Sequence, residues 1–463
     1  MNRSTFVSPD CIRAQFSRAM SDMYKTEVPL YGTLLELVAQ TNASVMQAQP
    51  QIAEHLRTTG EMDRLDMERH GAIRVGTPEE LSTIRRLFAV MGMQPVGYYD
   101  LTPAGVPVHS TAFRATHEAS LQASPFRVFT SLLRLELIDD VELRTLAAQL
   151  LAQRQIFTLR AIELIERHEA NGGLSAEDAD SFVREALETF RWHTQATVSA
   201  EQYQRLHDQH RLIADVVAFK GPHINHLTPR TLDIDQVQAG MPRHGITPKA
   251  VIEGPPRREC PILLRQTSFK ALQEKVAFVG EGQGSHTARF GEIEQRGAAL
   301  TPKGRELYDR LLDQAREALG EFPSEGNALR YDALMADAFR AFPDDHTAMR
   351  REGLAFFRYF ATPEGIAARE QSGRPQQLEV LIDAGHVRCE ALVYEDFLPV
   401  SAAGIFQSNL GEGAQSDYAI SSSQVAFQAA LGATVQDELS LYAETQSRSL
   451  ALCAEQLGLG SLD

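Results

Sequence analysis

Apolar and polar positions repeat with two different periods along the chain, and the change of period predicts its elements. Residues 9–60 carry apolar side chains at helical spacing, as in IRAQFSRAM and YGTLLELVAQTNASVMQ. RHGAIRVG at 69–76 predicts a short strand. TPEELSTIRRLFAVMG at 77–92 predicts a helix, because it begins with a capping-box pattern and ends at a glycine. MQPVGYYDLT at 93–102 predicts a second strand, so a strand–helix–strand unit follows an N-terminal helical segment.

The rest of the chain alternates between helical and β-like stretches. Residues 126–215 have apolar positions three and four apart, which predicts a helical insertion. β-like patterns resume with VVAFK at 216–220, VAFVG and ARFGEIEQRG, and again with QQLEVLIDAGHVRCEALVYEDFLP. We therefore expect an α+β protein. The expected segments are an N-terminal helical part (1–65), the first part of a β core (66–125), the helical insertion (126–215), the second part of the β core (216–300), a helical segment (301–375), and C-terminal strands and a helix that complete a pocket (376–463).

The composition narrows the class of protein. Of 463 residues, 43% are hydrophobic and 23% are charged, as in ordinary globular proteins. The net charge of −16 argues against a nucleic-acid binder or a polybasic membrane-surface protein. The four cysteines are scattered without a C-x-x-C pair, which fits a reducing compartment. With neither a signal-peptide core nor an apolar run of about 18 residues, we expect a cytoplasmic protein that makes no membrane contact.

The strand predicted at 69–76 places two polar residues on one face. With a period of two, His70, Ala72 and Arg74 point the same way. A histidine beside an arginine suits a metal ligand next to a clamp for an anion. When this stretch is taken alone, a strand cap and a surface ion pair are the simpler explanation of the two residues.

Histidines and carboxylates recur in two later stretches. In GPHINHLTPR, His223 and His226 are three residues apart and point to opposite faces of a strand, so at most one of them faces a shared site. In ARFGEIEQRG, Glu292 and Glu294 share one strand face. Each stretch alone is explained by solvated residues or by loop residues.

Taken together, the three stretches offer what a two-histidine, one-carboxylate metal site requires. Such a site occupies one face of an octahedral metal and leaves about three positions open, which suffice for a chelating substrate and dioxygen. A structural zinc site would instead need four protein ligands, often cysteines, and no such set is present. The pattern therefore favours an open metal site that supports redox chemistry.

The sequence resembles the family of 2-oxoadipate dioxygenase/decarboxylases, also called 2-hydroxyglutarate synthases, over essentially its full length. The resemblance is carried by RHGAIRVGTPEEL, KGPHINHLTPR, RFGEIEQRG and EDFLPVSAAGIFQSNL. It implies a fold of the vicinal-oxygen-chelate type, in which a β-sheet wraps around a metal. It also implies an Fe(II)-dependent enzyme of lysine breakdown, with a 2-oxo dicarboxylic acid and O2 as its small-molecule partners. That enzyme converts 2-oxoadipate to D-2-hydroxyglutarate and CO2.

The resemblance also assigns roles to individual residues. The residues that it implies as ligands of Fe(II) are His70, His226 and Glu294. Arg74 would bind a carboxylate of the substrate, which agrees with the ability of a planar guanidinium to hold a carboxylate with two hydrogen bonds. Val400 and Ser401 would line the substrate pocket through main-chain groups. His223 would face away from the metal, or assist as a partner of a ligand or of the substrate.

Two other functions fit parts of the same pattern. A zinc-, nickel- or manganese-dependent isomerase or lyase of the glyoxalase type would use similar ligands without oxygen, and Glu292 or His223 could then supply a fourth ligand. A non-enzymatic acidic interaction protein would hold no metal, and its histidines would be incidental. Dependence on dioxygen separates the dioxygenase from both alternatives.

Overall fold

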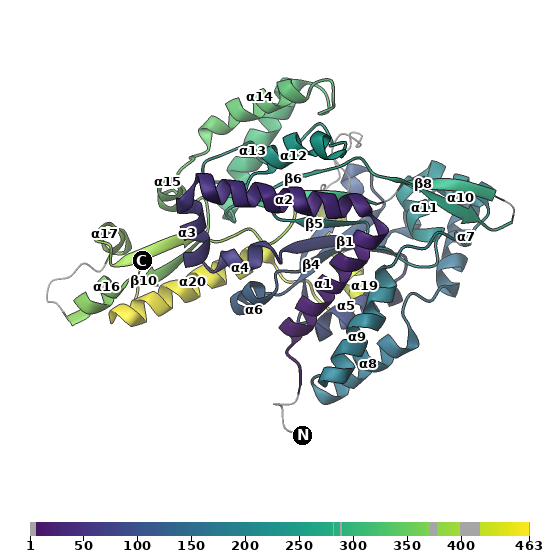
Figure 1. The fold of residues 1–463 in the computed structure, drawn as a ribbon, viewed down its shortest axis with the longest axis horizontal. Coiled ribbons are helices and arrows are strands. Elements are labelled where there is room, and N and C mark those ends of the chain that lie inside the picture. The colour runs from purple at the N-terminus through teal and green to yellow at the C-terminus, as the bar shows by residue number, and fades with distance from the viewer. Residues whose placement is uncertain (1–5, 281, 288, 371–376, 399–416, 463) are drawn as a thin grey trace. The chain divides into compact units, whose positions relative to one another are not determined.

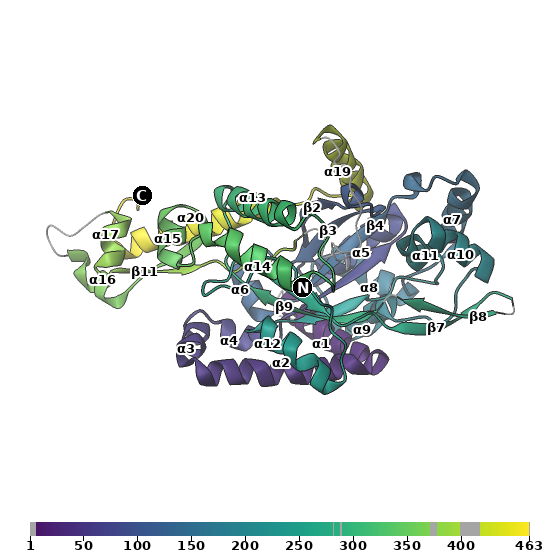
Figure 2. The ribbon, with the colours of Figure 1, turned by 90° about the horizontal axis from the view of Figure 1, so that it is seen from above.

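The computed structural model describes residues 6–280, 282–287, 289–370, 377–398 and 417–462. The chain forms two compact units. The first comprises residues 1–253, 266–295 and 397–435, and the second comprises residues 254–265, 296–396 and 436–463. Helices and a mixed sheet confirm the expected α+β class (Figures 1 and 2).

A seven-stranded sheet is the centre of the first unit. Its strands, in spatial order, are β2 (Gln94–Asp100), β3 (Val108–Arg114), β4 (Arg127–Leu133), β1 (Arg69–Val75), β5 (His226–Pro229), β9 (Phe290–Arg296) and β6 (Leu264–Ser268). β1 is parallel to β4 and antiparallel to β5, and β5 is parallel to β9. The three stretches that suggested a metal site thus supply three adjacent strands, β1, β5 and β9.

Helices surround this sheet (Figure 1). The helices of the first unit are α1 (Pro9–Glu27), α2 (Pro29–Ala48), α3 (Pro50–Thr58), α4 (Glu61–Leu65), α5 (Pro78–Val90), α6 (Glu118–Ala123), α7 (Val141–Gln153), α8 (Leu159–Asn171), α9 (Ala176–Leu187), α10 (Ala200–Gln209), α11 (Arg211–Val217), α12 (Ile234–Gly240) and α19 (Asp417–Leu431). α1 packs against α2 and α9, and α5 packs against α8 and α19.

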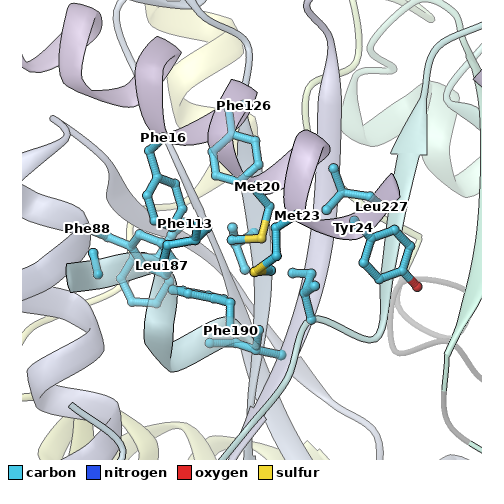
Figure 3. Packing of buried hydrophobic residues seen from close by; sticks show 14 of the residues in the cluster. Phe16, Met20, Met23, Tyr24, Phe88, Phe113, Phe126, Leu187, Phe190 and Leu227 are labelled. Carbon is cyan, nitrogen blue, oxygen red and sulfur yellow. The ribbon is translucent and has the colours of Figure 1, made fainter. Parts of the chain in front are cut away.

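The two faces of the sheet bury different kinds of residue. On one face, which we call the outer face, apolar side chains such as Ile73, Val128 and Ile293 pack against α1, α5 and α9. Figure 3 shows part of this core, where Phe16, Met20 and neighbouring side chains interdigitate. The other face, which we call the site face, carries the polar residues of β1, β5 and β9.

The outer core fixes the strands that carry the site. Tyr24 on α1 donates its hydroxyl toward the carbonyls of Asn225 and Phe290, at 2.9 and 2.8 Å, just where β5 and β9 begin. Gly71 allows a close approach as well, since a Cβ there would lie 2.5 Å from Cδ1 of Ile224. A Cβ at position 71 would therefore require the Ile224 side chain to shift, and it would also lie 3.1 Å from the carbonyl oxygen of His226.

A separate two-stranded hairpin, β7 (Gln273–Phe278) and β8 (Gly282–Thr287), projects beside α10 and α11 (Figure 2). Its first strand is tied to the preceding helical region by backbone hydrogen bonds between Ala277 and residues 194 and 196. Phe278 packs on Tyr203 of α10, with 5.0 Å between ring centroids. These contacts anchor the hairpin to the first unit.

The second unit contains helices and a two-stranded sheet. Its elements are α13 (Pro302–Leu319), α14 (Ala328–Ala338), α15 (His346–Arg351), β10 (Phe357–Ala361), α16 (Pro363–Ala367), α17 (Leu378–Asp383), β11 (Val387–Ala391) and α20 (Glu438–Leu457). β10 and β11 are antiparallel, and α20 packs against β10. Among the described residues, no helix is both long and apolar enough to cross a membrane.

The expected strand–helix–strand unit is confirmed as β1, α5 and β2. The Thr77 side chain caps α5 by accepting the backbone N–H of Glu80 at 3.2 Å. Gly92, with φ of +67°, follows the helix in the left-handed conformation that glycine tolerates best.

Several stretches differ from the predicted elements. Residues 357–361 form β10 within the segment that was expected to be helical. Residues 127–133, expected at the start of the helical insertion, form β4, and residues 216–217, expected in a strand, end α11. Both stretches are buried throughout, so they lack the alternation that separates strand from helix. Residues 378–383 form α17 rather than a strand, with Leu378 and Leu381 buried at helical spacing.

Candidate metal centre

Two neighbouring strands bring two histidines together on the site face. The antiparallel pairing of β1 and β5 sets His70 opposite Thr228. His226, two residues before Thr228, therefore occupies the next position on the same face of β5. The two imidazole rings are nearly perpendicular, with 5.5 Å between their centroids. Both histidines are fully buried. Because side chains alternate between the two faces of a strand, β1 and β5 each place one imidazole on the buried site face.

Two glutamates of β9 contact the ring of His70. Glu292 Oε1 lies 3.0 Å from Nε2 of His70, and Glu294 Oε2 lies 2.8 Å from Nδ1. Burial lowers the pKa of His70, but the two carboxylates outweigh burial and leave the pKa above its usual value. His70 therefore has a carboxylate at each of its ring nitrogens.

One oxygen of Glu292 accepts several hydrogen bonds. Thr228 Oγ1 and Gln266 Nε2 donate to Oε1 at 3.0 and 2.8 Å. Nε2 of His226 lies 3.8 Å from the same oxygen. The second oxygen, Oε2, is buried and has no hydrogen-bond partner within the described part of the chain. Glu292 is thus held firmly through one oxygen and keeps the other unpartnered.

The arrangement has the donor set of a transition-metal site. Among the described residues, His70, His226 and Glu292 each offer a ligand atom, and these atoms lie within 4.8 Å of one another. Among the residues that the structure describes, both ring nitrogens of His226 are buried without a hydrogen-bond partner, which costs free energy unless a bound group uses them. Burial lowers the pKa of His226 to about 4, so near pH 7 its ring is neutral, as metal binding requires.

Glu294, the carboxylate predicted as a ligand, adjoins this set through His70. Its Oε1 lies 3.6 Å from Nη1 of Arg127, and Arg127 Nη2 pairs with Glu68 Oε1 at 2.5 Å. Arg230 Nη1 pairs with the other oxygen of Glu68 at 3.1 Å. All of these residues are buried, so an ionic network fixes Glu294 within the first unit.

Aromatic rings enclose the histidines. The ring of Phe397 contacts His70 edge to face at 4.9 Å and also contacts Phe129 on β4 at 5.4 Å. Phe290 stacks on His226 at 4.9 Å. Apolar walls of this kind lower the local dielectric constant, which strengthens the interactions of charged groups inside.

Arg74 lies four residues beyond His70, on the same face of β1. Its Nη1 donates to Oδ2 of Asp215, on α11, at 2.8 Å. Nε2 of His223 lies 3.5 Å from Oδ1 of Asp215 and 3.1 Å from Nδ2 of Asn225. His223 thus belongs to the surroundings of Arg74, whereas His226 belongs to the metal set.

A model of the family described as 2-oxoadipate dioxygenase/decarboxylase matches residues 16–409. The chain belongs to this family. A 2-oxoadipate dioxygenase/decarboxylase of Pseudomonas putida (strain KT2440) is 71% identical over 464 residues, covering 100% of both chains. Its counterpart in Escherichia coli (strain K12) is 58% identical over 447 residues, covering 96% of this chain and 98% of the relative.

A solved structure of a family member is also similar. The hydroxyglutarate synthase of Pseudomonas putida in complex with 2-oxoadipate superimposes with a TM-score of 0.93 at 71% identity. The alignment covers 98% of this chain and 100% of that chain. The resemblance inferred from four stretches of sequence is therefore confirmed over nearly the whole length.

Within this 2-oxoadipate dioxygenase/decarboxylase fold, the predicted site residues meet different outcomes. His70 and His226 lie together, Glu294 contacts His70, and Val400 and Ser401 lie outside the described residues. The sequence singled out neither the hydrogen-bond partners of Glu292 nor the carboxylate that pairs with Arg74. The residues missed in this way are Thr228, Gln266 and Asp215. Only Thr228 carried a local signal, since it shares the strand face of His226.

Proposed function

We propose that the protein is an Fe(II)-dependent dioxygenase that converts 2-oxoadipate and O2 to D-2-hydroxyglutarate and CO2 in the cytoplasm, as a step of lysine breakdown. The observation that carries the proposal is the buried pair His70 and His226 beside two glutamates, with no described residue hydrogen-bonded to either nitrogen of His226. The family name and the 2-oxoadipate complex of the Pseudomonas putida relative support the substrate.

The donors suit iron better than a closed zinc site. Two neutral imidazoles and one carboxylate are the ligands of non-haem Fe(II) oxygenases, and they leave positions open for substrate and oxygen. Among the described residues no cysteine belongs to the set, whereas structural zinc sites commonly use cysteines.

We propose Glu294 as the carboxylate ligand, with His70 binding the metal through Nδ1. Glu292 would then accept the Nε2 proton of His70, because a metal-bound histidine commonly donates its other N–H to a carboxylate. The hydrogen bonds from Thr228 and Gln266 suit Glu292 for this orienting role. The reverse assignment would use Oε2 of Glu292, which has no hydrogen-bond partner among the described residues. The paired variants Glu292→Gln and Glu294→Gln distinguish the two assignments.

The side chains around the metal would have different roles. Bound Fe(II) would supply the redox chemistry by which dioxygen oxidises the 2-oxo acid with release of CO2. Arg74 would hold the far carboxylate of the substrate, and main-chain groups of Val400 and Ser401 would line the pocket. Phe397, Phe129 and Phe290 would limit access of water to the reacting atoms. We assign no general base, since substrate and oxygen together provide all atoms of the products.

The test uses protein purified without oxygen, loaded with Fe(II) and mixed with 2-oxoadipate in an oxygen-electrode cell. We expect one O2 consumed and one CO2 released for each 2-hydroxyglutarate formed. His70→Ala should abolish both oxygen uptake and metal binding, whereas His244→Ala, at an exposed site, should change neither. Stoichiometric metal without oxygen uptake would favour a non-redox isomerase or lyase instead.

A further inference from the structure

A chain of hydrogen bonds leads away from Arg74 through three side chains that the reaction does not require. Arg74 Nη1 donates to Asp215 Oδ2 at 2.8 Å, and Nε2 of His286 lies 2.8 Å from Asp215 Oδ1. Nδ1 of His286 lies 2.7 Å from the hydroxyl of Tyr203. The chain therefore connects β1 with α11, the hairpin strand β8 and helix α10.

The direction of each hydrogen bond follows from the chemistry of the groups. A carboxylate only accepts, so His286 donates its Nε2–H to Asp215. Burial, followed by the charge of Asp215, raises the pKa of Tyr203 to about 12, so its hydroxyl keeps its proton and donates to Nδ1. His286 thus donates through Nε2 and accepts through Nδ1, which satisfies both neighbours at once.

Packing holds these residues in place. His286 and Asp215 are buried, at 3% and 7% relative exposure. The ring of Trp192 stacks almost parallel to that of His286, with 10° between the ring planes and 6.0 Å between the centroids. The ring of Phe219 also contacts His286, with 4.8 Å between the centroids. Imidazole and carboxylate therefore have little freedom to turn away from Arg74.

A buried carboxylate beside an arginine needs a reason beyond stability, because buried ion pairs contribute little once the cost of desolvation is counted. Asp215 has two further neighbours, His286 and His223, besides Arg74. A guanidinium carries five N–H donors in one plane. An acceptor at Nη1 therefore restricts the orientation of that plane.

We propose that Asp215, His286 and Tyr203 are positioning residues that orient the guanidinium of Arg74, so that the site selects 2-oxo acids with a second carboxylate at the far end. The inference rests on the proposed role of Arg74 in binding that carboxylate. Displacing a binding group by about 1 Å is enough to lower catalysis about 100-fold, so loss of the chain should be measurable.

The decisive comparison uses two substrates of equal length, 2-oxoadipate and 2-oxohexanoate, which lacks the far carboxylate. For Asp215→Asn we expect kcat/KM for 2-oxoadipate to fall about 100-fold, chiefly through KM, while the value for 2-oxohexanoate and the iron content stay unchanged. Equal losses on both substrates would reveal a merely structural role and overturn the proposal. Tighter binding of 2-oxoadipate would overturn it too, since Asp215 would then compete with the substrate for Arg74.

Tyr203→Phe tests the far end of the chain with a change that removes one oxygen only. We expect a smaller loss, confined to 2-oxoadipate, and an intermediate loss for His286→Gln. Glu201→Gln, an exposed change on the same helix α10, is the matched control and should leave both substrates unaffected. If Tyr203→Phe and His286→Gln both kept wild-type discrimination, the chain would have no positioning role.

Binding without oxygen separates this inference from the proposed function. The dissociation constants of both acids for the Fe(II)-loaded protein, measured by calorimetry under anaerobic conditions, do not depend on turnover. If the wild type binds 2-oxoadipate but consumes no oxygen, the proposed function is wrong. The ratio of the dissociation constants of the two acids for Asp215→Asn then still tests the positioning role of the hydrogen-bond chain. If wild type and Asp215→Asn show the same ratio of the two dissociation constants, the hydrogen-bond chain has no positioning role, whatever the activity.

Discussion

The metal centre and the surroundings of Arg74 are both buried, yet their hydrogen bonding is opposite. Around the candidate metal centre, both nitrogens of His226 and one oxygen of Glu292 have no hydrogen-bond partner among the residues that the structure describes. Around Arg74, each oxygen of Asp215 and each ring nitrogen of His286 has a hydrogen-bond partner. Since buried polar atoms rarely stay unpaired in proteins, the first region is suited to binding a group from outside the chain. The second region is suited to holding a side chain still.

His226 and His223 sharpen this contrast because only two residues separate them. Burial lowers the pKa of both, to about 4 and about 3. Neither burial nor pKa therefore distinguishes the ligand from the supporting residue. The partners do, since His223 has Asp215 and Asn225 beside it, whereas His226 faces the ligand set.

The largest expected effect comes from removing the unpartnered imidazole. His226→Ala should abolish activity and lower the affinity for Fe(II) by at least about 100-fold, because even changes outside the ligands cost 10- to 100-fold. Metal content after dialysis and oxygen uptake are the measurements. The metal-free variant should remain folded by circular dichroism. If the variant kept one iron per chain, His226 would not be a metal ligand, and the proposed difference between His226 and His223 would be wrong.

The two glutamates of β9 provide the next test. Glu294→Gln should abolish tight Fe(II) binding, whereas Glu292→Gln should weaken it by about 10- to 100-fold, the cost of losing an orienting partner. Titration of the metal-free proteins with Fe(II) gives both affinities. The opposite order would assign the metal to Glu292 and make Glu294 the residue that orients His70.

Arg74→Lys probes the second region without removing its charge. We expect KM for 2-oxoadipate to rise about 10-fold or more, because a lysine cannot hold a carboxylate with two parallel hydrogen bonds. Iron content should stay at the wild-type level, since the change lies outside the metal set. Arg205→Lys, on the half-exposed surface of α10, is the control. An equal rise for 2-oxohexanoate would show that Arg74 does not read the far carboxylate.

What the sequence could predict follows from how far each interaction reaches. His70 and Arg74 share one strand, and the period of two alone places them on one face. The meeting of His70 with Glu292 and Glu294 joins residues more than 200 positions apart, so it required the family resemblance. Asp215 gave no signal, because it lies on a helix whose buried run has no clear period.

The misassigned strand β4 has a physical explanation of the same kind. Every residue of β4 is buried, with Val128 on the outer face and Phe129 on the site face. A strand covered on both sides shows no alternation of apolar and polar residues. Arg127, which pairs with Glu68, was therefore hidden inside an expected helix.

The smallest expected effect concerns stability, and it isolates His223. Burial lowers the pKa of this histidine to about 3 in the folded protein, against about 6.5 when unfolded. Below pH 6.5 the unfolded chain therefore binds a proton at His223 that the folded protein does not, and stability falls as the pH falls. Between pH 6.5 and 5, His223→Gln should lose about 2 kcal/mol less free energy of unfolding than the wild type. Urea titrations at both pH values measure this difference. Equal losses would mean that His223 is readily protonated in the folded protein, and the region around Arg74 would then carry an additional positive charge.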